Sequence, residues 1–232
     1  MVRIRHAMAC SLRFVFGYVL ILSEKNVIFV SRSKTICRLI VRAFNKVLFY
    51  NMEKKTIWDM GRLSVEEYRR RRKIPLTVVV DNVRSLNNIG SLLRTCDAFG
   101  VERVALCGIT ATPPSAEIHK TALGAEDSVE WVYYPTTGEA LDALEAEGYV
   151  LACLEQVKGS VELGDFVPED GRRYALVCGN EVDGVAQDVV DRCGLCLEIP
   201  QIGTKHSLNV TVSTAVAIWH FFNYFLKTTD IR

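Results

Sequence analysis

Three short polar clusters, each placed after an apolar stretch, hold the residues that are best suited to chemistry. The first contains Asn88 and Arg94 in the pattern Asn-x-Gly-x-x-x-Arg, and the second contains Glu181 in Gly-x-Glu-x-x-Gly. The third is Ser-Leu-Asn-Val, which begins at Ser207 and includes Asn209. An arginine in an apolar helix needs an anion, a carboxylate accepts hydrogen bonds, and a helix start offers free backbone N–H groups. These residue types predict a site that binds and orients a polar ligand.

Each cluster also has a purely structural interpretation, which the residues alone leave open. Asn88 can cap a helix over Ile89–Phe99, and Arg94 can form a salt bridge with a carboxylate at the sheet edge. Glycine pairs after a strand are typical of tight turns, which would explain the surroundings of Glu181. Ser207 can cap a helix, although this leaves Asn209 unexplained.

The elements that would position these clusters alternate along the chain. Strands are expected at 76–80, 104–107, 129–133, 149–154, 174–178 and 195–199, and helices at 63–73, 89–99, 115–123, 137–147, 186–193 and 208–226. Such alternation predicts an α/β fold with a parallel sheet and helices on both faces. Ligands in such folds bind outside the carboxyl ends of the strands. Because the three clusters follow strands 76–80, 174–178 and 195–199, we expect them to converge at one edge. No GxGxxG follows the first strand, so a dinucleotide site is not indicated.

Composition and charge divide the chain into parts. The 232 residues are 49% hydrophobic and 24% charged, as in a globular protein with a sizeable core. Residues 1–51 carry nine Lys/Arg and one acidic residue, whereas residues 52–232 carry 19 basic and 26 acidic residues. We therefore expect a basic extension over 1–51, a helical lead-in over 52–75 and one domain over 76–228. An upstream start that does not belong to the protein is the favoured interpretation of 1–51. A membrane-proximal or secretory segment and a basic arm that touches RNA are the alternatives.

Neither a membrane span nor a metal site is expected. The apolar run Phe14–Leu22 is shorter than the ~20 residues that a bilayer requires, and no cleavage signal follows it. The eight cysteines lie mostly in apolar runs, which indicates free thiols in a reducing cytoplasm. Cys193 and Cys196 form a lone CxxC without a partner pair at zinc spacing, which favours a structural interpretation.

Taken together and in order, the three motifs resemble those of the SpoU/TrmH family of RNA ribose methyltransferases, in the SPOUT superfamily. The resemblance covers residues 76–226, and the segment from Lys120 to Glu126 is also similar to one these enzymes carry. It implies a C-terminal trefoil knot, a homodimer, and S-adenosyl-methionine bound in the knot. Spacing alone would not have predicted a knot, because chains generally avoid them.

The resemblance also assigns residues. It implies catalytic roles for Arg94, Asn88, Glu181, Ser207 and Asn209, and cofactor binding by Gly179, Glu181, Ile199, Gly203, Ser207, Leu208 and Asn209. Arg84, Arg94, Lys120, Arg172 and Arg173 are the candidate RNA contacts, each with a solvated charged surface as its alternative. The implied reaction is methyl transfer to a ribose 2′-hydroxyl of tRNA or, less favoured, rRNA. The alternatives are a non-catalytic RNA-binding or ribosome-assembly module on the same fold and, with no resemblance at all, an unrelated nucleotide-binding α/β protein.

Overall fold

The computed structural model describes residues 11–15, 18–22, 27–30, 54–56, 59, 61, 63–205 and 207–228. The chain divides into two compact units, Met1–Arg62 and Leu63–Arg232. In the first unit, strands β1 (Ser11–Val15), β2 (Tyr18–Leu22) and β3 (Val27–Val30) form an antiparallel sheet in that order. The second part of the predicted basic extension, residues 31–51, lies outside the described residues. In the part of the chain that is described, no helix has the length and apolar character needed to cross a membrane.

The second unit is built on a seven-stranded sheet in which every neighbouring pair is parallel, in the order β6-β5-β4-β9-β7-β10-β8. Its strands are β4 (Ile74–Asp81), β5 (Val101–Cys107), β6 (Trp131–Tyr134), β7 (Tyr149–Leu154), β8 (Val161–Glu162), β9 (Arg173–Cys178) and β10 (Leu195–Glu198). Residues of the central strand β4 are almost all buried, which explains its continuous apolar sequence.

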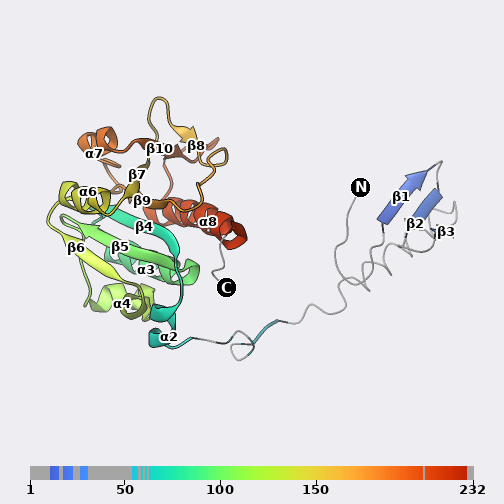
Figure 1. Cartoon of the computed structure of the whole chain (residues 1–232), viewed down its shortest axis with the longest axis horizontal. Helices are drawn as coiled ribbons and strands as arrows, with labels where there is room; N and C mark the ends of the chain where they lie inside the picture. The colour runs from blue at the N-terminus through green and yellow to red at the C-terminus, as the bar shows by residue number, and fades with distance from the viewer. Residues whose placement is uncertain are drawn as a thin grey trace. The chain divides into compact units, whose positions relative to one another are not determined.

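Helices cover both faces of this sheet (Figure 1). The helices are α2 (Val65–Arg70), α3 (Leu86–Phe99), α4 (Ala116–Ala122), α5 (Ala125–Ser128), α6 (Thr137–Ala146), α7 (Gln187–Arg192) and α8 (Val210–Thr228). Val78 and Val80 pack with α3, α4 and α8 in one core, whereas Val79 packs with α6 and α7 in the other. This alternation follows from the two-residue period of a strand. The predicted parallel α/β architecture is therefore confirmed, and the knot stays a prediction.

Two of the helix starts that differ from the prediction concern the site. Helix α3 begins at Leu86 rather than Ile89, because the Ser85 hydroxyl caps it by accepting from the Asn88 backbone N–H at 3.3 Å. Helix α8 begins at Val210 rather than Leu208, and the Asn209 side-chain oxygen accepts from the Thr211 N–H at 3.0 Å. Asn209 therefore occupies the capping position expected for Ser207. At the start of α2, Ser64 and Glu67 form a capping box, in which the Glu67 N–H donates to Ser64 Oγ at 3.2 Å and the Ser64 N–H donates to Glu67 Oε2 at 2.7 Å.

Candidate active site

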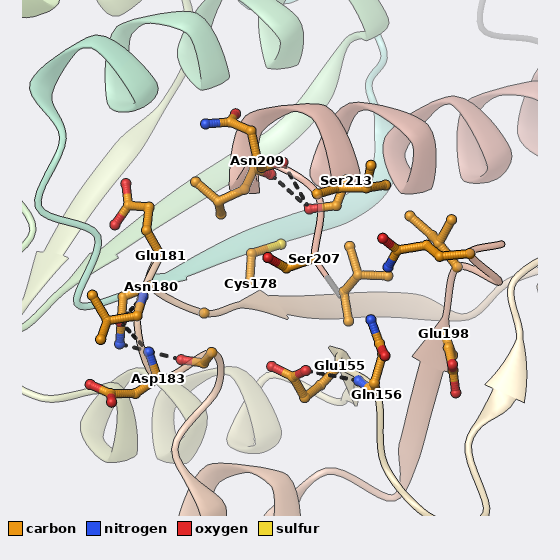
Figure 2. A pocket seen from close by; sticks show the side chains of 18 of the residues that line it. Glu155, Gln156, Cys178, Asn180, Glu181, Asp183, Glu198, Ser207, Asn209 and Ser213 are labelled. Atoms are coloured by element: carbon orange, nitrogen blue, oxygen red, sulfur yellow. Dashed lines mark hydrogen bonds between the residues drawn. The ribbon is translucent and has the colours of Figure 1, made fainter. Parts of the chain in front are cut away.

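The carboxyl ends of four adjacent strands, β4, β9, β7 and β10, bring the three clusters together as expected. A pocket of about 460 Å³ lies over the ends of β9, β7 and β10 and the start of α8 (Figure 2). This volume lies within the usual range for small-molecule sites of ~300–1,000 Å³. Of the seven expected cofactor residues, six line the pocket: Gly179, Glu181, Ile199, Ser207, Leu208 and Asn209. The seventh, Gly203, lies in the exposed loop between β10 and α8 and is not part of the lining.

Side chains from all three clusters are joined by hydrogen bonds. The Asn88 amide Nδ2 donates to Glu181 Oε1 at 2.6 Å, and its Oδ1 accepts from Asn209 Nδ2 at 3.3 Å. Thr211 Oγ1 lies within hydrogen-bond distance of both Asn88 Oδ1 (3.2 Å) and Asn209 Oδ1 (2.8 Å). Hence Glu181 orients a neighbouring asparagine, and residues separated by more than 90 positions in the sequence form one polar network.

Asn88 is free to make these contacts because it does not cap its own helix. Ser85 accepts from the Asn88 backbone N–H, which leaves the Asn88 side chain available on the first turn of α3. The predicted capping role of Asn88 is therefore wrong. The sequence does offer Ser85, directly before the apolar Leu86, as a second capping candidate, but propensity alone does not choose between the two.

The loop that carries Glu181 has a defined conformation. Asn180 and Gly184 exchange backbone hydrogen bonds at 3.1 and 3.2 Å, and Asn180 Oδ1 accepts from the N–H groups of Val182 and Asp183, both at 2.9 Å. A Cβ at Gly179 would lie 2.0 Å from the Gly184 carbonyl carbon, so glycine is required there. The tight turn and the ligand site are thus two aspects of one loop.

Two carboxylates that the sequence analysis did not select hold the far end of this loop. Glu155, directly after β7, accepts from the Val185 N–H at 2.9 Å, and Asp81, at the end of β4, accepts from the Ala186 N–H at 3.4 Å. Asp81 is 2% exposed, and Glu155 lines the pocket. Both residues stand at the carboxyl end of a strand, which was the available signal.

Gly90 serves the packing of α3 against α4 rather than contact with a ligand. A Cβ at this position would lie 2.1 Å from Thr121 Oγ1 and 2.3 Å from the Ile118 carbonyl oxygen. Thr121 Oγ1 also donates to the Asn87 carbonyl at 3.1 Å. The segment that resembles a family motif at Lys120–Glu126 therefore supports the helix that carries Asn88 and Arg94.

Arg94 is exposed on α3, and no hydrogen bond or ion pair joins it to another residue in the described part of the chain. The alternative that a carboxylate of the sheet edge neutralises it therefore has no support. Arg84 and Lys120 are also exposed and lie near the same edge, Arg84 just before α3 and Lys120 in α4. All three cations are open to a phosphate.

Arg172 and Arg173 lie elsewhere, at the start of β9 and therefore at the amino edge of the sheet. Arg173 pairs with Glu102 at 3.0 Å and lies 4.0 Å from the centre of the Tyr149 ring. Arg172 pairs with Glu169 at 3.4 Å. The structure does not bring these two arginines to the pocket.

The charges around the pocket restrict what it can bind. Among its described lining residues are four carboxylates, Glu155, Glu181, Asp183 and Glu198, and no Lys or Arg. Sites for nucleotide phosphates use cations or a glycine-rich helix start to hold the negative charge. This lining suits a ligand without phosphates that carries positive charge.

The cysteines contribute packing in the described chain. Cys153 and Cys196 face each other on β7 and β10 with their sulfurs 3.0 Å apart, and both are free thiols. Burial raises the pKa of the Cys196 thiol to about 12, which keeps it protonated. Within the described residues, no group of three or more His, Cys, Asp or Glu side chains is arranged to hold a metal ion.

Comparison with known proteins decides the family. The SpoU rRNA Methylase family matches residues 75–219, which contain all three clusters. The chain belongs to this family. The SpoU match covers the sheet from β4 to β10 and the first half of α8, so the pocket and the Asn88 network lie within it.

Individual SpoU relatives agree with this assignment. The chain is 32% identical over 167 residues to the tRNA (guanosine(18)-2′-O)-methyltransferase of Thermus thermophilus, a match that covers 69% of this chain and 81% of that protein. It is 32% identical over 149 residues to mouse tRNA (guanosine(18)-2′-O)-methyltransferase TARBP1, covering 63% of this chain and 9% of that much longer protein. The crystal structure of AdoMet-bound rRNA methyltransferase from Sinorhizobium meliloti has the same fold, with a TM-score of 0.61 at 24% identity, covering 71% of this chain and 62% of that one.

Proposed function

We propose that this protein transfers a methyl group from S-adenosyl-methionine to a ribose 2′-hydroxyl of structured RNA. The observation that carries the proposal is the network of Asn88, Glu181 and Asn209, which joins the three family motifs at the rim of one pocket. The names of its relatives, a tRNA 2′-O-methyltransferase among them, support the same reaction.

The pocket fits the cofactor by its chemistry. S-adenosyl-methionine supplies an activated methyl group on a sulfonium, and it carries no phosphate. The acidic lining suits that positive charge, and Leu154, Ile199 and Leu208 provide apolar surface for a nucleoside. Backbone at Gly179, Ile199 and Leu208 would hold it together with Ser207 and Asn209. The AdoMet-bound state of a structural neighbour supports this assignment.

We assign Arg94 to the RNA. Its guanidinium stays protonated at neutral pH, so it acts as a cation that holds a phosphate and polarises the ribose hydroxyl. The exposed, unpartnered position of Arg94 on the helix that carries Asn88 supports this role. Arg84 and Lys120 would extend the phosphate contact along the same edge, whereas nothing in the fold adds support for Arg172 and Arg173.

The RNA is tRNA rather than rRNA in this proposal. The T. thermophilus relative, of which this chain spans 81%, acts on guanosine 18 of tRNA by its name. Ribosomal RNA is the alternative, since the family itself is named for rRNA methylation. The free thiols and the RNA substrate favour a cytoplasmic protein.

We also propose that two copies of the chain form a homodimer through α3 and α8. The C-terminal part of the chain would form the trefoil knot that the family resemblance implies. A groove between these helices is lined by residues that include Phe99, Val212, Val216 and Trp219, and Trp219 is 52% exposed. Such a contiguous apolar surface is typical of a protein interface. Asn88 and Asn209 line the groove as well as the active-site network, so the interface would lie beside the site.

The test is transfer of tritium from labelled S-adenosyl-methionine by the full chain to tRNA and, separately, to rRNA, with Arg94→Ala as the negative control. We expect label in tRNA that resists alkali, as a 2′-O-methylated linkage must. Label in rRNA alone would keep the reaction and change the substrate. No transfer to either RNA by a folded, cofactor-binding protein would reject the enzymatic function and leave a binding module.

A further inference from the structure

Glu155 is a carboxylate of the pocket to which the proposed reaction gives no individual role. It follows β7 directly and is half-buried. Its Oε2 accepts from the Val185 N–H at 2.9 Å, and its Oε1 accepts from the Gln156 N–H at 2.8 Å. It forms no ion pair with any described residue. A half-buried carboxylate without a cation is costly unless further donors reach it.

Each oxygen of Glu155 has one more acceptor position. An ionised carboxylate offers about four lone-pair directions, two on each oxygen, and the two backbone N–H groups occupy one on each. The two fixed N–H groups also hold the carboxylate in one orientation, with both oxygens available to a pair of neighbouring donors. Figure 2 shows the Glu155 side chain directed across the pocket toward the loop of Glu181 and Asp183.

The order of the strands places Glu155 beyond the reacting end of the pocket. Asn88 follows β4, Glu181 follows β9 and Glu155 follows β7, in the order of the sheet. Neighbouring strands are ~4.8 Å apart. In the cofactor, the sulfonium is bonded to C5′ of the ribose, and the ribose presents two adjacent hydroxyl donors that match the two remaining acceptor positions of Glu155.

We infer that Glu155 binds the ribose 2′- and 3′-hydroxyls of the cofactor through its two carboxylate oxygens. The inference rests on the proposed function, because it assigns a partner to a residue of that same pocket. An acidic side chain at the carboxyl edge of a parallel sheet binds a ribose hydroxyl in dinucleotide-binding folds as well, so the chemistry has a physical precedent.

Two of the three other lining carboxylates already accept a hydrogen bond from a neighbouring side chain. Glu198 accepts from the Ser160 hydroxyl at 2.6 Å, and in Figure 2 its carboxylate points away from the other labelled side chains. Glu181 is engaged by Asn88. Glu198 therefore provides a matched control, a glutamate of the same pocket at the end of the adjacent strand β10.

Glu155 also holds the loop through Val185, so the experiment must separate ribose binding from loop positioning. The probes are S-adenosyl-homocysteine and its 2′-deoxy and 3′-deoxy analogues, with dissociation constants measured by calorimetry on the full chain. The wild type should bind each deoxy analogue about 10- to 100-fold more weakly, the range for a hydrogen bond to a charged group. In Glu155→Gln this difference should shrink to about threefold, because the acceptor is neutral and one oxygen is lost. Glu198→Gln should keep the full difference.

The outcomes separate the two roles. If Glu155→Gln weakens all three ligands by one common factor, Glu155 only positions the loop and the inference is overturned. It is also overturned if the wild type does not distinguish the analogues while binding the parent compound, in which case the proposed function still stands. Failure of the wild type to bind S-adenosyl-homocysteine at all would overturn the proposed function and this inference together. Glutamine retains an oxygen for the Val185 N–H, so this variant should fold, and its thermal unfolding provides the check.

Discussion

The side-chain amide of Asn88 donates to the carboxylate of Glu181 at 2.6 Å, although 93 positions separate the two residues. One residue comes from the first turn of α3 and the other from the loop after β9. The contact fixes the orientation of the Asn88 side chain, whose oxygen then meets Asn209 and Thr211. The active-site geometry depends on this hydrogen bond.

Replacing Asn88 should therefore impair catalysis more than folding. Asn88→Ala removes the link between Glu181 and Asn209, and displacing reacting groups by about 1 Å costs on the order of 100-fold in rate. We expect that loss in kcat/KM for methyl transfer. The control is Asn87→Ala, at the exposed neighbouring position, where only the backbone carbonyl is used; a similar loss there would contradict the special role of Asn88.

Arg94→Ala should weaken RNA binding in a salt-dependent way. Loss of one phosphate contact lowers the slope of log affinity against log salt by roughly 0.7–1, while cofactor affinity should not change. Filter binding of tRNA between low and moderate salt measures the slope. Arg192→Ala, which removes an arginine paired with Asp142 on the opposite face of the sheet, should leave the slope as it is.

Gly90→Ala should destabilise the fold. The added methyl group would collide with the Ile118 carbonyl of α4, and overpacking of this kind costs about 1–3 kcal/mol. Gly138→Ala is the matched control in helix α6, where the nearest atom outside the helix is 3.7 Å away and alanine should stabilise by up to ~1 kcal/mol. Urea unfolding of both variants gives the free energies, and equal stabilities would contradict the packing role.

The protein should lose stability as pH rises above 9. Burial raises the pKa of the Cys178 thiol from 9.0 to about 12, so the unfolded chain ionises this group before the native one does. The contribution of the Cys178 thiol to the free energy of unfolding is fully present below pH 9 and is lost as the pH approaches 12. Unfolding free energies at pH 7.5 and pH 10 test this, and Cys178→Ala should show a smaller decrease over the same interval. An equal decrease would assign the effect to other groups.

Val216→Glu should dissociate the proposed dimer. Val216 is 42% exposed in the groove between α3 and α8, and burying a charge there without a partner is costly. Sedimentation velocity should show a monomer, whereas Lys227→Glu, at the end of α8 and outside the groove, should stay dimeric. A wild type that is monomeric would reject the dimer itself.

The sequence predicted most of the sheet because most of its strands are apolar runs followed directly by polar, Gly or Pro residues. Tyr149–Leu154 was predicted to the residue. The sequence analysis missed strand β8, because a strand of two exposed residues has no periodic pattern of apolar side chains. The start of α3 was misplaced since Asn88 and Ser85 are equally good caps on propensity, and only the partner Glu181 decides between them.

For the site, the order of the motifs predicted the residues, but contacts between elements that are distant in the sequence could not be predicted from motif spacing. Glu155 and Asp81 act on the Glu181 loop through backbone N–H groups 30 and 105 positions away. For Arg94 the sequence left open a ligand anion or a carboxylate of the sheet edge, and its position on the exposed side of α3 favours the ligand. Which side chains of a helix face the sheet depends on the rotation of the helix about its own axis. The spacing of apolar residues predicts this rotation only approximately.

If the proposed reaction uses the network of Asn88, Glu181 and Asn209, the network also determines when the protein can act during its synthesis. The chain is made from its N-terminus and domains generally fold as units, so β4 and α3 are synthesised long before Asn209. A nascent chain that has completed the sheet but not yet docked α8 lacks one of the three partners. Methylation activity would therefore begin abruptly, with the arrival of the last helix, and never on a partly made polypeptide.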